Sequence, residues 1–250
     1  MTTPAWRPVV DALERAHGAG RTIEIWLRDD DAVAATGALG RLADLCVSFS
    51  MPILLAIIPA RAEQDLAPWI ADHVAVTPCQ HGFAHINHAA LGAKACELGG
   101  ARDIAAVIED LRRGRDRLRS LLGSRLADVL VPPWNRIAPA VIPHLPDLGF
   151  VALSAFGPPP PAVEAMLPRL NCDLDIVDWR RHRTGREPDD VAAKLAELIE
   201  AGHGRPIGLL THHLAHDATA WAVLEEMLGT LRCHPAAAFV APDIRRRSPA

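Results

Sequence analysis

Short apolar runs alternate with amphipathic segments along the whole chain. An apolar run of strand length predicts a strand buried on both faces, and apolar residues that recur every three or four positions predict a helix. The clearest helix pattern covers residues 103–122, with apolar side chains on one face and arginines on the other. Strands are predicted at 22–27, 53–58, 74–77, 129–131, 150–153, 171–177, 207–211 and 238–240. Helices are predicted at 9–17, 38–49, 66–71, 103–122, 137–148, 189–201 and 218–231.

This alternation predicts an α/β fold, with a parallel sheet and covering helices in either a barrel or an open doubly wound sheet. The chain contains neither a G-x-G-x-x-G after a predicted strand nor a G-x-x-x-x-G-K-[ST] motif, so nothing favours the open nucleotide-binding sheet. Polar clusters follow the predicted strands, and barrels build their sites at such strand ends. We therefore predict a TIM-like barrel forming a single domain over residues 1–250. The proline run 158–161 is interpreted as an exposed loop because the alternation resumes after it.

Composition narrows the class of protein further. The 250 residues are 50% hydrophobic, and a net charge of -4 argues against nucleic acid or an anionic membrane as a partner. The five cysteines are scattered without a C-x-x-C pair, which is typical of free thiols in a reducing compartment. No stretch approaches the ~20 apolar residues of a membrane span, and no signal peptide is recognised. We expect a cytoplasmic protein; the oligomeric state stays open.

Three carboxylates, Asp29, Asp30 and Asp31, follow the apolar run 23–27 directly. Like charges this close disfavour one another, so such a cluster usually serves a cation or a proton transfer. The alternative is a solvated acidic turn that caps the next helix. This stretch alone does not decide between the two.

A histidine cluster follows the third predicted strand, with His81, His85 and His88 within the segment 80–88. His81 and His85 are four residues apart, so on one helical turn both imidazoles would face the same way and could chelate one metal. One carboxylate from the acidic cluster would complete an Asp-His-His set with open positions for water and substrate. His88 could be a spare ligand, an outer partner or a surface residue.

Three further polar clusters fall after later predicted strands. Residues 131–136 form a stiff proline turn that presents Trp134, Asn135 and Arg136. Residues 173–179 end in Asp178 and Trp179, and residues 209–217 contain further histidines. Each has a plain structural explanation alone, but their occurrence at successive strand ends indicates a site.

The ordered motifs D-D, H-x-x-x-H, P-P-aromatic, D-W and L-x-H resemble those of the polysaccharide deacetylases, carbohydrate esterase family 4, over about residues 22–217. The resemblance implies a distorted (β/α)7 barrel. It also implies an enzyme that removes N- or O-acetyl groups from sugars with one divalent metal ion, most often zinc.

The resemblance also implies a role for each matching residue. Asp30 would be the general base, and His212 the general acid oriented by the carboxylate of Asp178. The metal ligands would be Asp31, His81 and His85. The backbone N–H of Trp134 would stabilise the oxyanion. Trp179 and Leu210 would form the acetyl pocket. We also expect Trp134 and Asn135, which the proline turn presents, to bind the substrate.

Two positions depart from the family pattern. Gly82 stands where the second motif has serine or threonine, and Val131 stands where the third has the arginine that pairs with the base. We hypothesise that Arg28 or Arg136 replaces that arginine. The chain also has no tyrosine and few aromatic residues, which is little material for a long sugar-stacking groove.

We therefore expect a metal-dependent hydrolase of a non-peptide amide, acting on an N-acetylated sugar or a small amide. One alternative is a barrel that binds metal but has lost catalysis and has a binding or structural role. Another is a hydrolase of cyclic amides.

Overall fold

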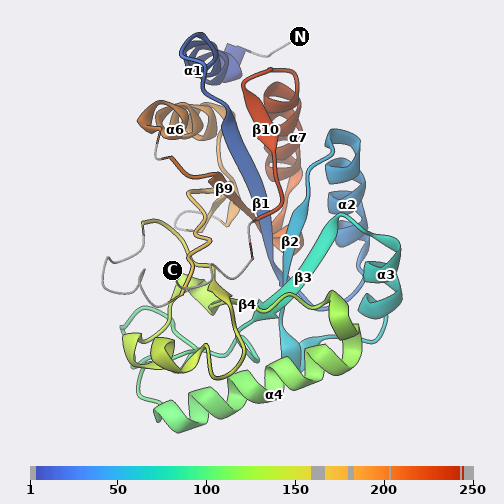
Figure 1. Cartoon of the computed structure of the whole chain (residues 1–250), viewed down its shortest axis with the longest axis vertical. Helices are drawn as coiled ribbons and strands as arrows, with labels where there is room; N and C mark the ends of the chain where they lie inside the picture. The colour runs from blue at the N-terminus through green and yellow to red at the C-terminus, as the bar shows by residue number, and fades with distance from the viewer. Residues whose placement is uncertain (1–3, 159–166, 180–182, 203, 243, 245–250) are drawn as a thin grey trace. The chain divides into compact units, whose positions relative to one another are not determined.

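The computed structural model describes residues 4–158, 167–179, 183–202, 204–242 and 244, and Figure 1 labels its elements. The sheet has the strand order β5-β4-β3-β2-β1-β9-β6, with β10 also paired to β1. The pairs β1–β9, β1–β10, β3–β4, β4–β5 and β6–β9 are all parallel. With its helices, this sheet confirms the predicted fold class, an α/β fold of the distorted (β/α)7 barrel type. The polyproline residues 159–161 lie outside the described residues.

The sheet strands are β1 Ile23–Ala32, β2 Ile53–Ile57, β3 Val76–His81, β4 Val129–Val131, β5 Ala152–Leu153, β6 Leu174–Asp175, β9 Ile207–Thr211 and β10 Ala237–Phe239. A separate antiparallel pair is formed by β7 Val177–Asp178 and β8 Thr184–Gly185. The helices are α1 Arg7–Gly18, α2 Gly37–Phe49, α3 Leu66–Asp72, α4 Ile104–Leu122, α6 Pro188–Ala201 and α7 Ala218–Arg232. Short 3-10 turns are η1 Pro4–Trp6, η2 Pro59–Arg61, η3 Gly123–Arg125, η4 Pro133–Asn135, η5 Pro139–His144 and η6 His213–Ala215. No helix in the described part of the chain is both long and apolar enough to span a bilayer.

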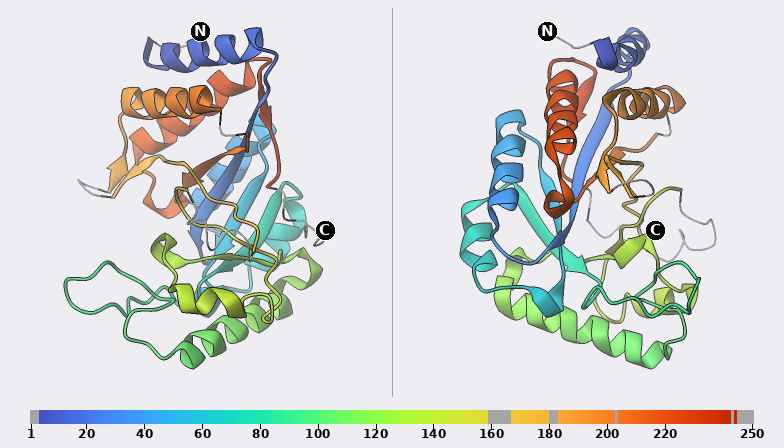
Figure 2. Two further views of the ribbon diagram at one scale, coloured as in Figure 1. Left: turned by 60° about the vertical axis from the view of Figure 1, so that its left-hand side comes forward. Right: turned by 180° about the vertical axis from the view of Figure 1, so that it is seen from behind.

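The chain divides into two compact units, which we describe separately. The first combines the N-terminal segment up to Asp29 with Gly37–Ile53 and Cys172–Pro242. Within it β1 pairs with β9 in a register that sets Arg28 opposite Leu210 and Asp29 opposite Thr211. The amphipathic helices α1 and α6 lie side by side in Figures 1 and 2 and pack through their apolar faces.

The second unit contains Asp30–Thr36 and Leu54–Asn171. Its longest helix, α4, begins after Asp103, whose side chain accepts a hydrogen bond from Ala105 N at 3.2 Å and so caps the helix. The buried face of α4 packs against β3 and η2. Gly114 permits this approach, because a Cβ there would lie 2.5 Å from Gln80 Nε2.

Two predicted strand ends fell short. We predicted that β1 ends at Leu27 and β3 at Thr77, but β1 continues through the three aspartates and β3 runs past Pro78 to His81. Both strands therefore carry charged or polar residues within the strand itself. Other predictions were too long: the helix expected at 137–148 is the 3-10 turn η5, and the strand expected at 171–177 is split into β6 and β7.

Candidate active site

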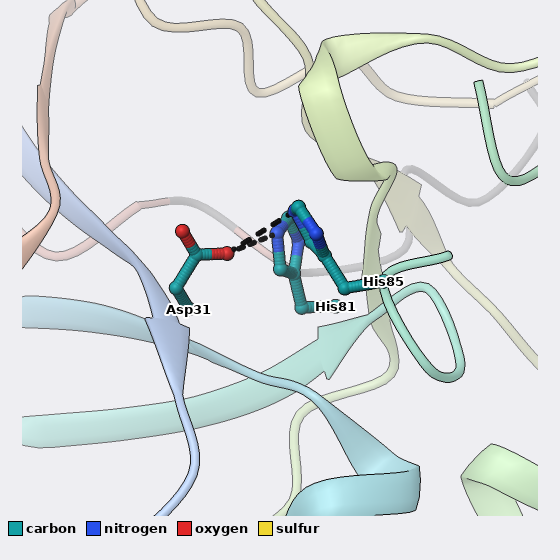
Figure 3. A group of neighbouring side chains, drawn as sticks. All are labelled: Asp31, His81 and His85. Atoms are coloured by element: carbon teal, nitrogen blue, oxygen red, sulfur yellow. Dashed lines mark ion pairs between the residues drawn. The ribbon is translucent and has the colours of Figure 1, made fainter. Parts of the chain in front are cut away.

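Asp31, His81 and His85 converge on one point of the second unit. Figure 3 shows both imidazoles directed at the same carboxylate oxygen. Asp31 Oδ1 lies 3.2 Å from His81 Nε2 and 3.3 Å from His85 Nε2. One atom from each residue lies within 4.8 Å of the others, so the three form a group that could hold a metal ion. His88 is not part of this group.

The two histidines do not share a helical turn, so that prediction was wrong. His81 is the last residue of β3, and His85 lies in the irregular segment that follows. Left-handed backbone at Gly82 (φ 51°) and His85 (φ 58°) turns the chain back toward Asp31, which itself has φ 72°. Such conformations cost non-glycine residues free energy, and they concentrate at functional sites.

The chemistry of the donors fits a divalent metal. His81 Nδ1 lies 3.0 Å from the carbonyl oxygen of Val131, which accepts a hydrogen bond only if Nδ1 carries a proton. In the neutral ring, Nε2 then presents a lone pair to the Asp31 carboxylate, which is also an acceptor. Two acceptors at 3.2 Å are stable only with a proton or a cation between them.

Burial favours the metal-binding form of His85. Removal of the ring from water lowers the pKa of His85, and the negative charge of Asp31 opposes that change. The net pKa lies below the ordinary value. The imidazole is therefore neutral at neutral pH, the form in which histidine binds a metal.

Trp134 lies beside this group within the second unit, and Asn135 follows it in the η4 turn. The Trp134 ring centroid is 4.3 Å from that of His85, at an interplanar angle of 52°. Both Trp134 and Asn135 have left-handed backbone, with φ values of 54° and 57°. Arg136 Nη1 donates a hydrogen bond to Ala95 O at 2.9 Å, so its guanidinium is bound to backbone.

A second cluster lies in the first unit around His212. Asp175 Oδ1 lies 4.0 Å from His212 Nδ1, and Asp175 Oδ2 accepts a hydrogen bond from Trp179 Nε1 at 2.9 Å. The Trp179 indole packs edge-on to the His212 ring with centroids 4.7 Å apart. The sequence analysis gave the orienting role to Asp178, which lies in the β7–β8 pair opposite Thr184. Asp175, which the sequence analysis did not name, is a carboxylate that lies beside His212.

Asp29, the first of the three aspartates, is fully buried in a network that the sequence analysis missed. Asp29 Oδ1 lies 2.5 Å from His213 Nδ1, and Oδ2 accepts hydrogen bonds from His213 N and Thr211 Oγ1 at 2.9 and 2.7 Å. Burial alone would raise the pKa of Asp29, but the charge and hydrogen bond of His213 outweigh it and lower the pKa overall. Asp29 therefore joins β1 to β9 as a structural carboxylate.

Three other predicted site residues are buried. Arg28 and Leu210 are fully buried on paired strands of the first unit, and Asp30 is buried in the second. His216 Nε2 accepts a hydrogen bond from His212 N at 3.4 Å, and its ring packs edge-on against Trp221.

The fold and these clusters define a parallel α/β barrel with an Asp-His-His group. No protein-family model matches the chain, and no curated protein sequence does either. Solved structures do match. A Mycobacterium smegmatis protein provisionally classed as a polysaccharide deacetylase has a TM-score of 0.60 at 16% identity, over 94% of this chain and 83% of that chain.

Two further structures belong to carbohydrate esterase family 4. The Clostridium thermocellum acetyl xylan esterase, solved with a cobalt ion, has a TM-score of 0.55 at 13% identity over 87% of both chains. A mutant of a family 4 pseudoenzyme with restored activity has a TM-score of 0.57 at 14% identity, over 87% of this chain and 64% of that chain. The chain thus has the fold of the polysaccharide deacetylases of carbohydrate esterase family 4.

Proposed function

We propose that the protein is a metal-dependent hydrolase that removes the acetyl group from an N-acetylated sugar or a small acetylated amide. The observation that carries this proposal is the convergence of Asp31, His81 and His85 on one point. The fold supports it, because structurally similar proteins include deacetylases and an esterase solved with a divalent metal.

Asp31, His81 and His85 would hold one divalent ion, which we expect to be zinc. A bound divalent ion lowers the pKa of water and polarises an amide carbonyl. Asp30 would take the proton of the attacking water. The Trp134 backbone N–H would donate to the oxyanion, an interaction typically worth about 3 kcal/mol.

His212 would donate a proton to the leaving amine. Asp175 lies beside the His212 ring and holds Trp179 in place, so we assign the orienting role to Asp175 in preference to Asp178. Trp179, Leu210 and Asn135 would contact the substrate.

Arg28 and Arg136 are the two candidates for the role of the motif arginine, and their surroundings differ. The Arg136 guanidinium already donates to Ala95 O, whereas Arg28 is buried on β1, two residues before Asp30. We therefore favour Arg28 over Arg136 as the partner of the base.

The substrate class that we propose is narrower than that of the similar proteins, which include one provisionally classed as a polysaccharide deacetylase and an acetyl xylan esterase. The chain has no tyrosine and only 4% aromatic residues, so aromatic stacking along a polymer has little support. A small acetylated substrate and a cytoplasmic location remain predictions from the sequence.

The proposal is tested by elemental analysis of the purified protein together with an acetate-release assay on a panel of N-acetylated sugars and small amides. It predicts one metal ion per chain and acetate release that a chelator abolishes. Release that persists at full rate without metal would contradict it.

A second candidate is a barrel that binds metal without catalysis. Gly82 and Val131 depart from the family motifs, and a family 4 pseudoenzyme shares the fold. Acetate release that Asp30→Asn abolishes would exclude this candidate.

A further inference from the structure

A buried carboxylate, Glu97, lies beneath the loop that carries His85, which we call the His85 loop (residues 82–88). Glu97 is 1% exposed. Its oxygens accept hydrogen bonds from three backbone N–H groups of the loop: Phe83 N at 3.0 Å, Ala84 N at 2.7 Å and Ile86 N at 3.3 Å. The last two donors are the residues on either side of His85.

The His85 loop has no helical or strand hydrogen bonds of its own after Gly82. Its backbone donors must find other partners, because an unsatisfied buried N–H is costly. A carboxylate is a strong acceptor, and a buried charge is stable only when such donors surround it. Glu97 and the loop therefore stabilise each other.

Gly82 shows that the loop is built around this carboxylate. A Cβ at residue 82 would lie 2.1 Å from Glu97 Oε2 and 2.5 Å from Pro133 Cγ. The positive φ of Gly82, 51°, also disfavours any side chain there. The space that a residue-82 side chain would need is filled by Glu97.

Glu97 is itself held firmly. The next residue, Leu98, is fully buried and forms a parallel bridge to Ile137, with Leu98 O accepting from Ala138 N at 2.8 Å. On the other side, Cys96 O accepts from His88 N at 2.9 Å. The carboxylate therefore connects the loop to a well-anchored segment.

We propose that Glu97 is a positioning residue that sets the His85 loop, and with it the His85 imidazole, in the geometry needed to bind the metal. This inference rests on the proposed function, because it assumes that His85 is a ligand. Glu97 acts through the loop backbone and is not part of the group that could hold the metal. It supplies the support that Gly82, without a side chain, does not.

The test compares Glu97→Gln with Glu109→Gln. Glutamine keeps the size of the side chain but replaces one acceptor oxygen with an NH₂ group that faces backbone donors. Glu109 lies in the same unit on α4, exposed and paired with Arg112, so its substitution is a matched control. Zinc affinity is measured by competition with a chelator, and amide exchange is followed by NMR on the metal-free proteins.

We expect Glu97→Gln to weaken zinc binding about 10–100-fold, as is typical when a group that orients a ligand is lost. Amide exchange at Phe83, Ala84 and Ile86 should accelerate, while the protection of α4 stays unchanged. Zinc affinity equal to that of Glu109→Gln would overturn the proposal.

Amide exchange separates failure of this inference from failure of the proposed function. If the wild type binds no zinc, the proposed function is wrong. The role of Glu97 in the loop would still be supported if the amides of Phe83, Ala84 and Ile86 exchange slowly in the wild type and faster in Glu97→Gln. Fast exchange at those amides in the metal-free wild type would overturn it.

Glu97→Asp covers the case in which Glu97→Gln does not fold. Aspartate keeps the charge but withdraws the oxygens by one methylene. It should weaken zinc binding less than Glu97→Gln yet measurably, and wild-type affinity in this variant would contradict a positioning role.

Discussion

The carbonyl oxygen of Val131 lies 3.0 Å from Nδ1 of His81. This backbone contact sets the tautomer of the ring and leaves Nε2 facing Asp31. Val131 stands where the resembling family has an arginine, but its contribution here comes from the main chain. The presence of valine in place of arginine at residue 131 therefore does not change the orientation of His81.

Asp30→Asn should abolish hydrolysis while zinc stays bound. Asparagine cannot accept the proton of the attacking water, and loss of a general base typically lowers the rate about 10²–10⁴-fold. The measurement is kcat for acetate release alongside zinc content. Wild-type turnover in a zinc-loaded Asp30→Asn protein would assign the base to another residue.

Asp175→Asn should reduce kcat more than Asp178→Asn. Asp175 Oδ1 lies 4.0 Å from His212 Nδ1 and its other oxygen holds the Trp179 indole, so the substitution disturbs both side chains. We expect a loss of about 10-fold or more, within the range of acid–base effects. A larger loss from Asp178→Asn, measured on the same substrate, would return the orienting role to Asp178.

Asp29→Asn should destabilise the fold by about 3–5 kcal/mol, because it breaks a fully buried pair with His213. The pKa of Asp29 is lowered in the folded state, so the carboxylate contributes stability above its unfolded pKa of about 4. That contribution is lost as the pH falls through the lower folded pKa. Urea unfolding at neutral pH measures the cost, and Glu109→Gln, on the surface, should cost under about 1 kcal/mol. A cost as small for Asp29→Asn would contradict the structural role.

His216→Phe should flatten the pH dependence of stability in mild acid. Burial lowers the pKa of His216 to about 4. Between that value and the unfolded pKa of about 6.5, only the unfolded chain binds the proton, so stability falls as the pH drops. The loss is at most about 3 kcal/mol between pH 7 and pH 4. Phenylalanine keeps the edge-on packing against Trp221 without titrating.

The difference in unfolding free energy between His216→Phe and wild type, measured across this pH range, should change by that amount. The control His144→Phe, at an exposed position, should show the same change of unfolding free energy with pH as the wild type. Parallel profiles for wild type and His216→Phe would show that the pKa of His216 is the same in the folded and unfolded states, which would contradict the prediction.

The fold class could be predicted because apolar runs and helical spacing report burial directly. Strand ends could not, because a composition rule ends a strand at its first charge or proline. Asp29 remains in β1 because His213 and Thr211, far along the chain, surround its carboxylate. Pro78 remains in β3, where its carbonyl accepts from Ala127 N at 2.8 Å.

The candidate site shows the same division. A group of two histidines and one carboxylate could be expected from the clusters after the predicted strands, and the resemblance selected Asp31 as the carboxylate. The left-handed turn at His85 could not be predicted. Glu97 had no motif to mark it; the missing side chain at Gly82 was the available signal. The sequence could not single out Asp175 from the neighbouring acids Asp173 and Asp178. The break between β6, which contains Asp175, and β7, which contains Asp178, is visible only in the structure.

The central claim is that Asp31, His81 and His85 bind one divalent metal ion, and zinc titration into the metal-free protein tests it most directly. Calorimetry should show one zinc per chain for the wild type and a loss of affinity beyond about 100-fold, more than an outer partner costs, for Asp31→Asn, His81→Gln and His85→Gln. His88→Gln, in the same loop but outside the group, should bind as the wild type does. A wild type that binds no zinc, or three ligand variants that bind it unchanged, would contradict the account.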